Sequence, residues 1–452
     1  MSGAVAAGHP ASVAAGADAL ASGGNAVDAC LAAAFTGFVV EGPLTGPAGG
    51  GFFLVQEPDG DCSMLDCFFA APSRAPGEMD EVVIEFSGAS QVFHVGEASV
   101  AVPGLLAGLE EAHSRFCALS WRRLVEPAVE LARHGVEVTA AQRSLYDLLA
   151  PILARSKAGR RVYGTPGELG TTELADSLEL IRDEGARALP GLVPELADDL
   201  RDYRVVEANV RRARFRGTDV LTAGEPSIGG AVVRSALTTL DHEALDPSDE
   251  AEVASSVAAA LRDAYARALP PPRVTGTTHV SAVDGEGRSA SLSMTLASGS
   301  GEFRGGFQLN NMLGEVDIVG IAPPSPGARL PSMMAPTIVL EGGRPRLVLG
   351  SAGSVRVAGA VVQVITRVIG LGASVAQAIA FPRLHPDGDV VHLEGGTSDE
   401  TEARLAADGW GVTRWDELSI YFGGVQGVEG DRDGVLHAAG DLRRGGAGVV
   451  LP

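Results

Sequence analysis

Thr277, which follows Gly276 directly, is the residue whose surroundings suggest chemistry most clearly. If the bond between them breaks, Thr277 carries a free α-amine beside its own hydroxyl, so one residue supplies both nucleophile and base. That amine has a pKa of roughly 7.7–8.0, which suits general-base work near neutral pH. Glycine at 276 adds no side-chain bulk, so an N-to-O acyl shift followed by ester hydrolysis can cut the chain here. Taken alone, a Gly-Thr pair more often marks a turn before a strand.

Acyl chemistry also needs hydrogen-bond donors for the negative charge that develops on oxygen. Residues 350–354 read GSAGS and lie between a predicted strand and a predicted helix that begins at Val355. Backbone N–H groups at such a turn have no partner within the helix and can point at an anion. An ordinary turn with a serine N-cap explains the same residues. A phosphate-binding loop is disfavoured, because no Walker-type or GxGxxG pattern is present.

The elements that must hold these residues change in character along the chain. Helices are predicted over 9–40 with a break at Gly23-Gly24, over 104–117, over 121–134, through most of 149–249, and over 251–268, closed by prolines 270–272. Two hairpins follow, over 278–295 around Gly285-Glu286-Gly287 and over 337–349 around Glu341-Gly342-Gly343, and then a helix over 355–369. Strands and helices do not alternate, so a strand-rich core between helical layers is expected rather than a doubly wound fold.

Composition excludes several classes of protein. The 452 residues include 45% hydrophobic side chains, enough for one large layered domain or for two to three smaller ones. The net charge is −22, and the densest basic run, 211–216, is short, so neither nucleic acid nor an anionic membrane is an expected partner. No apolar run is long enough to span a bilayer, and no targeting segment is evident, so a cytoplasmic location is expected.

The cysteines do not suggest a metal site. Cys30, Cys62, Cys67 and Cys117 show no CxxC or Cys/His ligand spacing, so neither a metal nor another cofactor is expected. The simplest interpretation is four buried or partly buried thiols, with a Cys62–Cys67 disulfide as the alternative.

The chain resembles the γ-glutamyltranspeptidases, which are N-terminal nucleophile hydrolases, in ordered blocks along almost its whole length. The blocks are His9-Pro10 with GGNAVDA at 23–29, GGGF at 49–52, VPG at 102–104, the segment 121–130, TTHVSAVD at 277–284, LNN at 309–311, MAPT at 334–337, GS at 350–351, GGVQ at 423–426 and DLRR at 441–444.

This resemblance implies an α+β fold, a four-layer αββα sandwich. It also implies self-cleavage before Thr277 into a large subunit, 1–276, and a small subunit, 277–452, which together form one domain. Thr277 would be the nucleophile and its new amine the base. Thr295 stands where the family has a second threonine that hydrogen-bonds the nucleophile. Gly353 and Ser354 align with the family's paired oxyanion-hole glycines, and the serine makes a left-handed backbone less favourable there.

The residues that should hold a glutamate differ from the family pattern. Residues 66–72 read DCFFAAP, so Phe68 occupies the position of the arginine that binds the substrate's α-carboxylate, and an aromatic ring cannot make that bidentate pair. Ala297 replaces an asparagine. In the block that begins at Leu309, Asn311 is retained and Glu315 replaces the aspartate that binds the substrate's ammonium group. Ser332-Met333 replaces a Ser-Ser pair. Together these changes predict a remade and more apolar substrate pocket.

Three functions remain open at this point. The first is an autoprocessed hydrolase of altered specificity, resembling the family branch in actinomycete pathways to lincomycin, hormaomycin and pyrrolobenzodiazepines, and cleaving a C–C or amide bond of a proline- or pyrroline-type small molecule. The second is true γ-glutamyl hydrolysis or transfer on glutathione-like substrates, with a cephalosporin-acylase-like amidase as its neighbour. The third is an uncut, non-enzymatic relative. A higher oligomer is compatible with all three.

Overall fold

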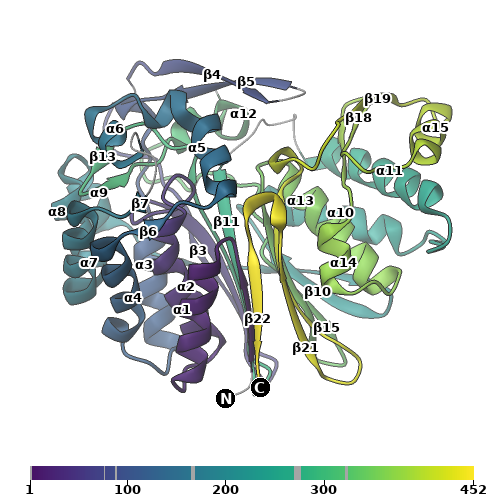
Figure 1. Ribbon diagram of the computed structural model, residues 1–452, viewed down its shortest axis with the longest axis horizontal. Coiled ribbons are helices and arrows are strands. Elements are labelled where there is room, and N and C mark those ends of the chain that lie inside the picture. The colour runs from purple at the N-terminus through teal and green to yellow at the C-terminus, as the bar shows by residue number, and fades with distance from the viewer. Residues whose placement is uncertain (1–2, 76, 87–88, 164–167, 269–275, 321–323) are drawn as a thin grey trace.

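The computed structural model describes residues 3–75, 77–86, 89–163, 168–268, 276–320 and 324–452. Two antiparallel sheets lie face to face at its centre, and helices cover the outer face of each (Figure 1). This arrangement confirms the predicted αββα sandwich.

Each sheet combines strands from both sides of Gly276. The first sheet has the spatial order β22 (Ala447–Leu451), β1 (Gly3–Ala7), β11 (Gly276–Asp284), β12 (Ser289–Ala297), β2 (Gly50–Gln56), β3 (Cys62–Cys67), β8 (Val206–Ala208). The second has the order β21 (Leu436–Gly440), β20 (Gly424–Gly430), β16 (Arg344–Ala352), β15 (Thr337–Glu341), β10 (Thr218–Ala223), β9 (Val210–Phe215). The parts of the chain before and after Gly276 therefore share one core.

The helices divide between the two outer faces. The first sheet is covered by α1 (Pro10–Ala21), α2 (Ala26–Val40) and α3 (Leu105–Phe116), with α4 (Trp121–His134) and α7 (Thr172–Glu184) packed outside them. The second is covered by α10 (Ile228–Leu240), α13 (Arg356–Ile365) and α14 (Val375–Ala380), with α11 (Glu250–Ala268) and α15 (Asp399–Ala407) outside. β11 and β12 are buried along almost their whole length, because α2 packs on one face and the second sheet on the other.

Further elements surround this sandwich. One of them, α5 (Ala140–Leu153), is as long as α4 of the sandwich. The others are α6 (Lys157–Tyr163), α8 (Leu189–Leu192), α9 (Ala197–Asp202), α12 (Val316–Val319), the hairpin β4 (Asp80–Phe86) and β5 (Ala89–Val95), the pairs β6 (Val136–Glu137) with β7 (Glu168–Leu169) and β13 (Phe303–Arg304) with β14 (Phe307–Gln308), and the sheet β17 (Leu384–Asp387), β18 (Val390–Leu393), β19 (Gly411–Arg414).

Local signals placed the helix ends well. The predicted break at Gly23-Gly24 separates α1 from α2, which begins with a capping box between Asn25 and Asp28. α4 begins after the N-cap Ser120 and ends at Gly135. Both predicted hairpins are present as β11–β12 and β15–β16. The prolines 270–272, predicted to close α11, lie outside the described residues.

The prediction of mostly helix through 149–249 was wrong in one part. Residues 206–223 form β8, β9 and β10, which are edge or near-edge strands of the two sheets. β9 reads VRRARF, and its arginines hid the strand pattern, because an edge strand can keep charged side chains in water. The alternative of a Cys62–Cys67 disulfide was also wrong, since all four cysteines are free.

Candidate active site

A β-bulge surrounds Thr277. In the pairing of β11 with β12, Gly276 lies opposite Ala297 while Thr278 lies opposite Met294, so Thr295 and Leu296 together face Thr277. Bulges of this kind re-aim side chains and are common next to active sites. Ala297 ends the bulge with a φ of +56°, a left-handed conformation unusual for a residue with a side chain.

Thr295 contacts the acyl side of the bond before Thr277. Its hydroxyl donates a hydrogen bond to the carbonyl oxygen of Gly276 and accepts one from the backbone N–H of Ala297 at 2.8 Å. Thr277 itself is 1% exposed. The two threonines predicted to act together are therefore neighbours.

The turn predicted to supply oxyanion donors lies beside Thr277. Gly353 has a φ of +127°, and a Cβ there would lie 2.7 Å from the Cα of Gly423, so the position requires glycine. Ser354 has a φ of +57°, so it adopts the left-handed conformation that the sequence analysis treats as less favourable for a serine. The alternative of a serine N-cap does not hold, because α13 begins after Val355 without a side-chain cap.

A small pocket of about 280 Å³, including its open mouth, lies between these groups. Its lining residues are Phe68, Thr277, Thr295, Ala297, Met312, Ser332, Met333, Met334, Ser354 and Val357. Seven of the predicted site residues therefore meet around one hollow, although they are far apart in the chain. None of these ten lining residues has an ionisable side chain that is charged at neutral pH.

Phe68 enters this pocket from an aromatic cluster. Its ring stacks on Phe52 with centroids 5.4 Å apart and meets Phe69 edge-on at 4.8 Å. Its backbone N–H donates to Asp66 at 2.8 Å, and its carbonyl accepts from Arg329 at 2.8 Å. Arg329 thus binds the backbone of this turn and is absent from the described lining of the pocket.

Three predicted site residues lie just outside the lining. Asn311 accepts a hydrogen bond from the backbone N–H of Ser298 at 2.7 Å and donates to the carbonyl of His94 at 3.1 Å. Glu315 is buried and accepts from the Ser298 hydroxyl at 3.1 Å. Both therefore support the chain just beyond the bulge. Gly353, the third, adjoins the lining residue Ser354.

Two functional candidates were missed from the sequence, Glu41 and Arg444. Glu41 is the C-cap residue of α2, and its carboxylate accepts a hydrogen bond from the hydroxyl of Thr278 at 2.7 Å. Arg444 donates to the carbonyl oxygen of Thr277 at 3.4 Å. Burial raises the pKa of Glu41 to about 7, although Thr278 and Arg444 oppose this, and burial lowers the pKa of Arg444 to about 10. An acidic residue at the end of a helix that is apolar through its last turn was the available signal for Glu41.

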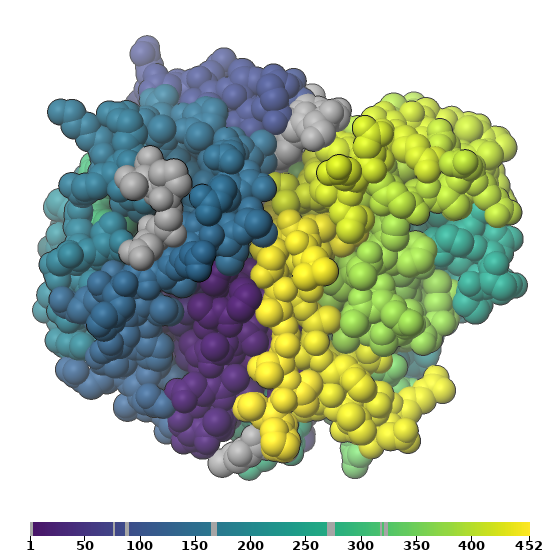
Figure 2. Space-filling model, viewed as in Figure 1, coloured from purple at the N-terminus to yellow at the C-terminus, as the bar shows by residue number. Residues whose placement is uncertain are grey.

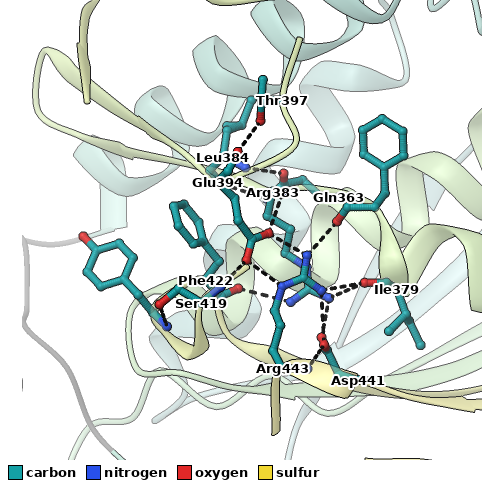
Figure 3. A network of polar contacts seen from close by, with 12 residues as sticks. Gln363, Ile379, Arg383, Leu384, Glu394, Thr397, Ser419, Phe422, Asp441 and Arg443 are labelled. Carbon is teal, nitrogen blue, oxygen red and sulfur yellow. Dashed lines mark hydrogen bonds and ion pairs between the residues drawn. The ribbon is translucent and has the colours of Figure 1, made fainter. Parts of the chain in front are cut away.

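A buried charge network anchors the segment that carries Arg444 (Figure 3). Arg383 pairs with Asp441 at 2.6 Å, and Arg443 pairs with Glu394 at 2.5 Å and with Asp441 at 3.1 Å. All four side chains are at most 2% exposed, and two cations balance two carboxylates. Figure 2 shows the C-terminal part of the chain along the seam between the two halves of the molecule.

His279 has a structural position rather than a catalytic one. Its ring lies between the sheets, 2.9 Å from the hydroxyl of Ser293 and 3.0 Å from that of Ser281. A Cβ on Gly350 would come within 2.3 Å of the ring, so glycine there makes room for it. Burial lowers the pKa of His279 to about 3, so the ring is neutral at physiological pH.

Among the described residues, no group of three or more His, Cys, Asp or Glu side chains could hold a metal ion. Within the same ranges, no helix combines the length and hydropathy that crossing a bilayer requires.

Comparison with known sequences gives one family. The family described as gamma-glutamyltranspeptidase matches residues 12–189 and 251–451. The Acylase ACY 1 proenzyme of Pseudomonas sp. (strain SE83) is 29% identical over 98% of this chain and 92% of its own length. The glutathione hydrolase proenzyme of Escherichia coli (strain K12) is 27% identical over 95% of this chain and 88% of its own length.

Solved structures share the fold over the full chain. Cephalosporin acylase from Bacillus halodurans has a TM-score of 0.84 at 20% identity, covering 99% of this chain and 95% of that one. LmbA2991 has a TM-score of 0.81 at 19% identity, and the match covers 100% of this chain and 98% of that one.

Proposed function

This chain belongs to the γ-glutamyltranspeptidase family, and on that premise we propose that it is a self-processing N-terminal threonine hydrolase for an uncharged acyl group. Self-cleavage before Thr277 gives subunits 1–276 and 277–452. These stay together because both contribute strands to both sheets.

The proposed reaction follows from the groups around the pocket. The Thr277 hydroxyl attacks the substrate carbonyl, and its own α-amine accepts the hydroxyl proton. Backbone N–H groups at Gly353 and Ser354 stabilise the negative charge on the carbonyl oxygen. The ammonium group then returns the proton to the leaving group. Water, activated by the same amine, hydrolyses the ester and frees Thr277.

The proposed substrate class rests on one observation, the neutral side chains of the ten residues that line the pocket. A γ-glutamyl group brings an α-carboxylate and an ammonium, and burying either charge without a partner is costly. Phe68 stands where the family resemblance places the carboxylate-binding arginine, and Met312, Met333 and Met334 add adaptable apolar surface. The likeness to an acylase over 98% of the chain supports amide hydrolysis.

The narrower proposal is a proline- or pyrroline-type biosynthetic intermediate cut at an amide or C–C bond. A vinylogous acyl group attacked by Thr277 would leave an acyl-enzyme that water clears, so both cuts use the same residues.

The test begins with the purified wild type and Thr277→Ala. The wild type should give two fragments on a denaturing gel, and the smaller fragment should begin at Thr277. The Thr277→Ala variant should give one uncut chain. A single wild-type band would overturn every enzymatic proposal and favour the uncut relative.

The processed enzyme is then given phenylacetyl-p-nitroanilide and γ-glutamyl-p-nitroanilide under equal conditions, with Thr277→Ala as the blank. The proposal expects release from the phenylacetyl compound at least tenfold faster. Faster release from the γ-glutamyl compound would overturn it in favour of γ-glutamyl hydrolysis. Adding glycylglycine to either reaction separates transfer from hydrolysis.

A further inference from the structure

Behind the nucleophile, a second cavity is lined by charged and polar side chains. Its lining includes His9, Glu41, Tyr146, Arg443 and Arg444, together with apolar residues of α2 and α5. Thr277 lines the neutral substrate pocket, while the side chain of the next residue, Thr278, donates to Glu41. Neighbouring residues of a strand point to opposite faces, so the two threonines connect two different environments.

The main chain of Thr277 is held from this second cavity. Arg444 donates to the Thr277 carbonyl oxygen at 3.4 Å, and covalent geometry then brings the guanidinium within about 7 Å of the Thr277 nitrogen. A Cβ on Gly424 would lie 2.5 Å from the Arg444 side chain, and one on Gly8 would lie 2.1 Å from the Glu41 carboxylate. Both charged groups therefore occupy spaces that glycine leaves open.

Arg444 and Glu41 have different anchors. The adjacent residue, Arg443, belongs to the buried network with Glu394 and Asp441, which fixes the segment 441–444. Glu41 is fixed at the end of α2. The pair is therefore held against the start of β11 from two independent directions.

We propose that Glu41 and Arg444 form a positioning pair that sets the protonation state of the Thr277 α-amine after self-cleavage. This inference rests on the proposed function, because only the cut chain has that amine. A cation near an amine disfavours its protonated form, and a carboxylate favours it. The amine must be neutral to accept the proton of its own hydroxyl.

The other charged and titratable groups around the amine act less directly. In the second cavity, the pKa of His9 is lowered by burial and that of Tyr146 is raised by burial, so both side chains are neutral near pH 7. Arg443 is paired with two carboxylates. His279, two residues further along β11, is neutral. The charges of Asp441, Arg356 and Arg383 influence the pKa of Arg444. The ten described residues that line the substrate pocket contribute no charged side chain.

Glu41 gives the pair a pH response. With a pKa of about 7, it changes charge in the range where the amine itself titrates. When Glu41 loses its proton, its negative charge offsets the positive charge of Arg444, and the proton affinity of the amine rises. The two ionisations are therefore coupled, and the wild-type titration should be broader than that of a single site.

The experiment measures the amine directly with potassium cyanate, which carbamylates only the neutral form. The rate of mass gain at Thr277 of the small subunit, followed by peptide mass spectrometry from pH 5.5 to 9, gives its titration curve without a substrate. The variants are Glu41→Gln, the double variant Glu41→Gln with Arg444→Met, and the control Arg214→Met, which removes an exposed arginine of β9.

Glu41→Gln should shift the midpoint down by about one pH unit, because an unbalanced cation then faces the amine. Adding Arg444→Met should move it back up by about one unit and narrow the curve to a single site. Arg214→Met should match the wild type. Unchanged curves in both Glu41 variants would overturn the proposal.

If Glu41 and Arg444 had only a structural role, replacing them would slow hydrolysis by the enzyme without moving the midpoints of the carbamylation curves in opposite directions. If the Glu41→Gln variant does not cleave itself, the double variant, which removes both charges, still tests the proposal, because its carbamylation curve should be narrower than that of the wild type. Failure of the wild type to cleave would defeat the proposed function instead, and the denaturing gel reports that separately.

Discussion

The hydroxyl of Thr295 donates a hydrogen bond to the carbonyl oxygen of Gly276. This oxygen gains negative charge when the Thr277 hydroxyl attacks the peptide bond that precedes it. The bulge in β12 creates the contact, and the left-handed Ala297 lets its own N–H hold the Thr295 oxygen. Thr295 is thus placed to assist the proposed self-cleavage as well as the proposed hydrolysis.

Thr295→Val should slow self-cleavage by about 10²–10³-fold, because one donor to the developing oxyanion is lost. Thr295→Ser keeps the hydroxyl and should cleave within about tenfold of the wild-type rate. The measurement is the fraction of cut chain against time after cell-free synthesis. Equal rates for valine and serine would remove Thr295 from this step.

Ser354→Gly should be more stable than Ser354→Ala by about 1 kcal/mol, because only glycine adopts a φ of +57° without strain. Both variants lose the same hydroxyl, so the comparison isolates the backbone. The free energy of unfolding by urea is measured in a Thr277→Ala background, which keeps the chain uncut. A more stable alanine variant would contradict the strained conformation.

Phe68→Arg should raise the ratio of kcat/KM for γ-glutamyl-p-nitroanilide over phenylacetyl-p-nitroanilide by about tenfold or more, because a guanidinium can pair with the α-carboxylate. It should also cost about 3 kcal/mol of stability, since Phe68 is 2% exposed and stacked on Phe52. Phe68→Leu is the control and should leave the ratio close to wild type. A ratio that rises equally in both variants would mean that the ring only blocks the pocket.

His279 predicts an acid-sensitive fold. Its pKa is about 3 in the folded chain against an ordinary value of 6.5, so the unfolded chain binds more protons between these values. The stability present above pH 6.5 is lost as the pH falls toward 3, by about 3 kcal/mol at pH 4.5. His279→Gln keeps hydrogen-bonding groups near Ser281 and Ser293 without this titration. The free energy of unfolding, measured with urea at pH 7 and at pH 4.5, should fall by about 3 kcal/mol less in this variant than in the wild type. Equal decreases in the two proteins would exclude His279 as the cause.

Features that depend on a few neighbouring residues could be predicted from the amino-acid sequence. Gly276-Thr277 ahead of a strand, the glycine turns of both hairpins, and the capping residues of α2 and α4 each act within a few positions, so they could be read without the fold. The ordered blocks also gave the family, and the substitution at Phe68 predicted a changed pocket. The strands over 206–223 were missed because an edge strand can lack the buried alternation that marks a central one.

How residues that are distant in the chain come together could be learned only from the folded structure. The pocket joins Phe68, Thr277 and Ser354, which come from the residue after β3, a central strand and a turn between sheet and helix. The bulge that aims Thr295 at Gly276 depends on strand register, and register is set by the packing of both faces of the sheet. Glu41 and Arg444 lie about four hundred positions apart, and nothing local marks them as partners. Their meeting beside Thr277 and Thr278 depends on burial of both side chains in one core, a property of the folded chain as a whole.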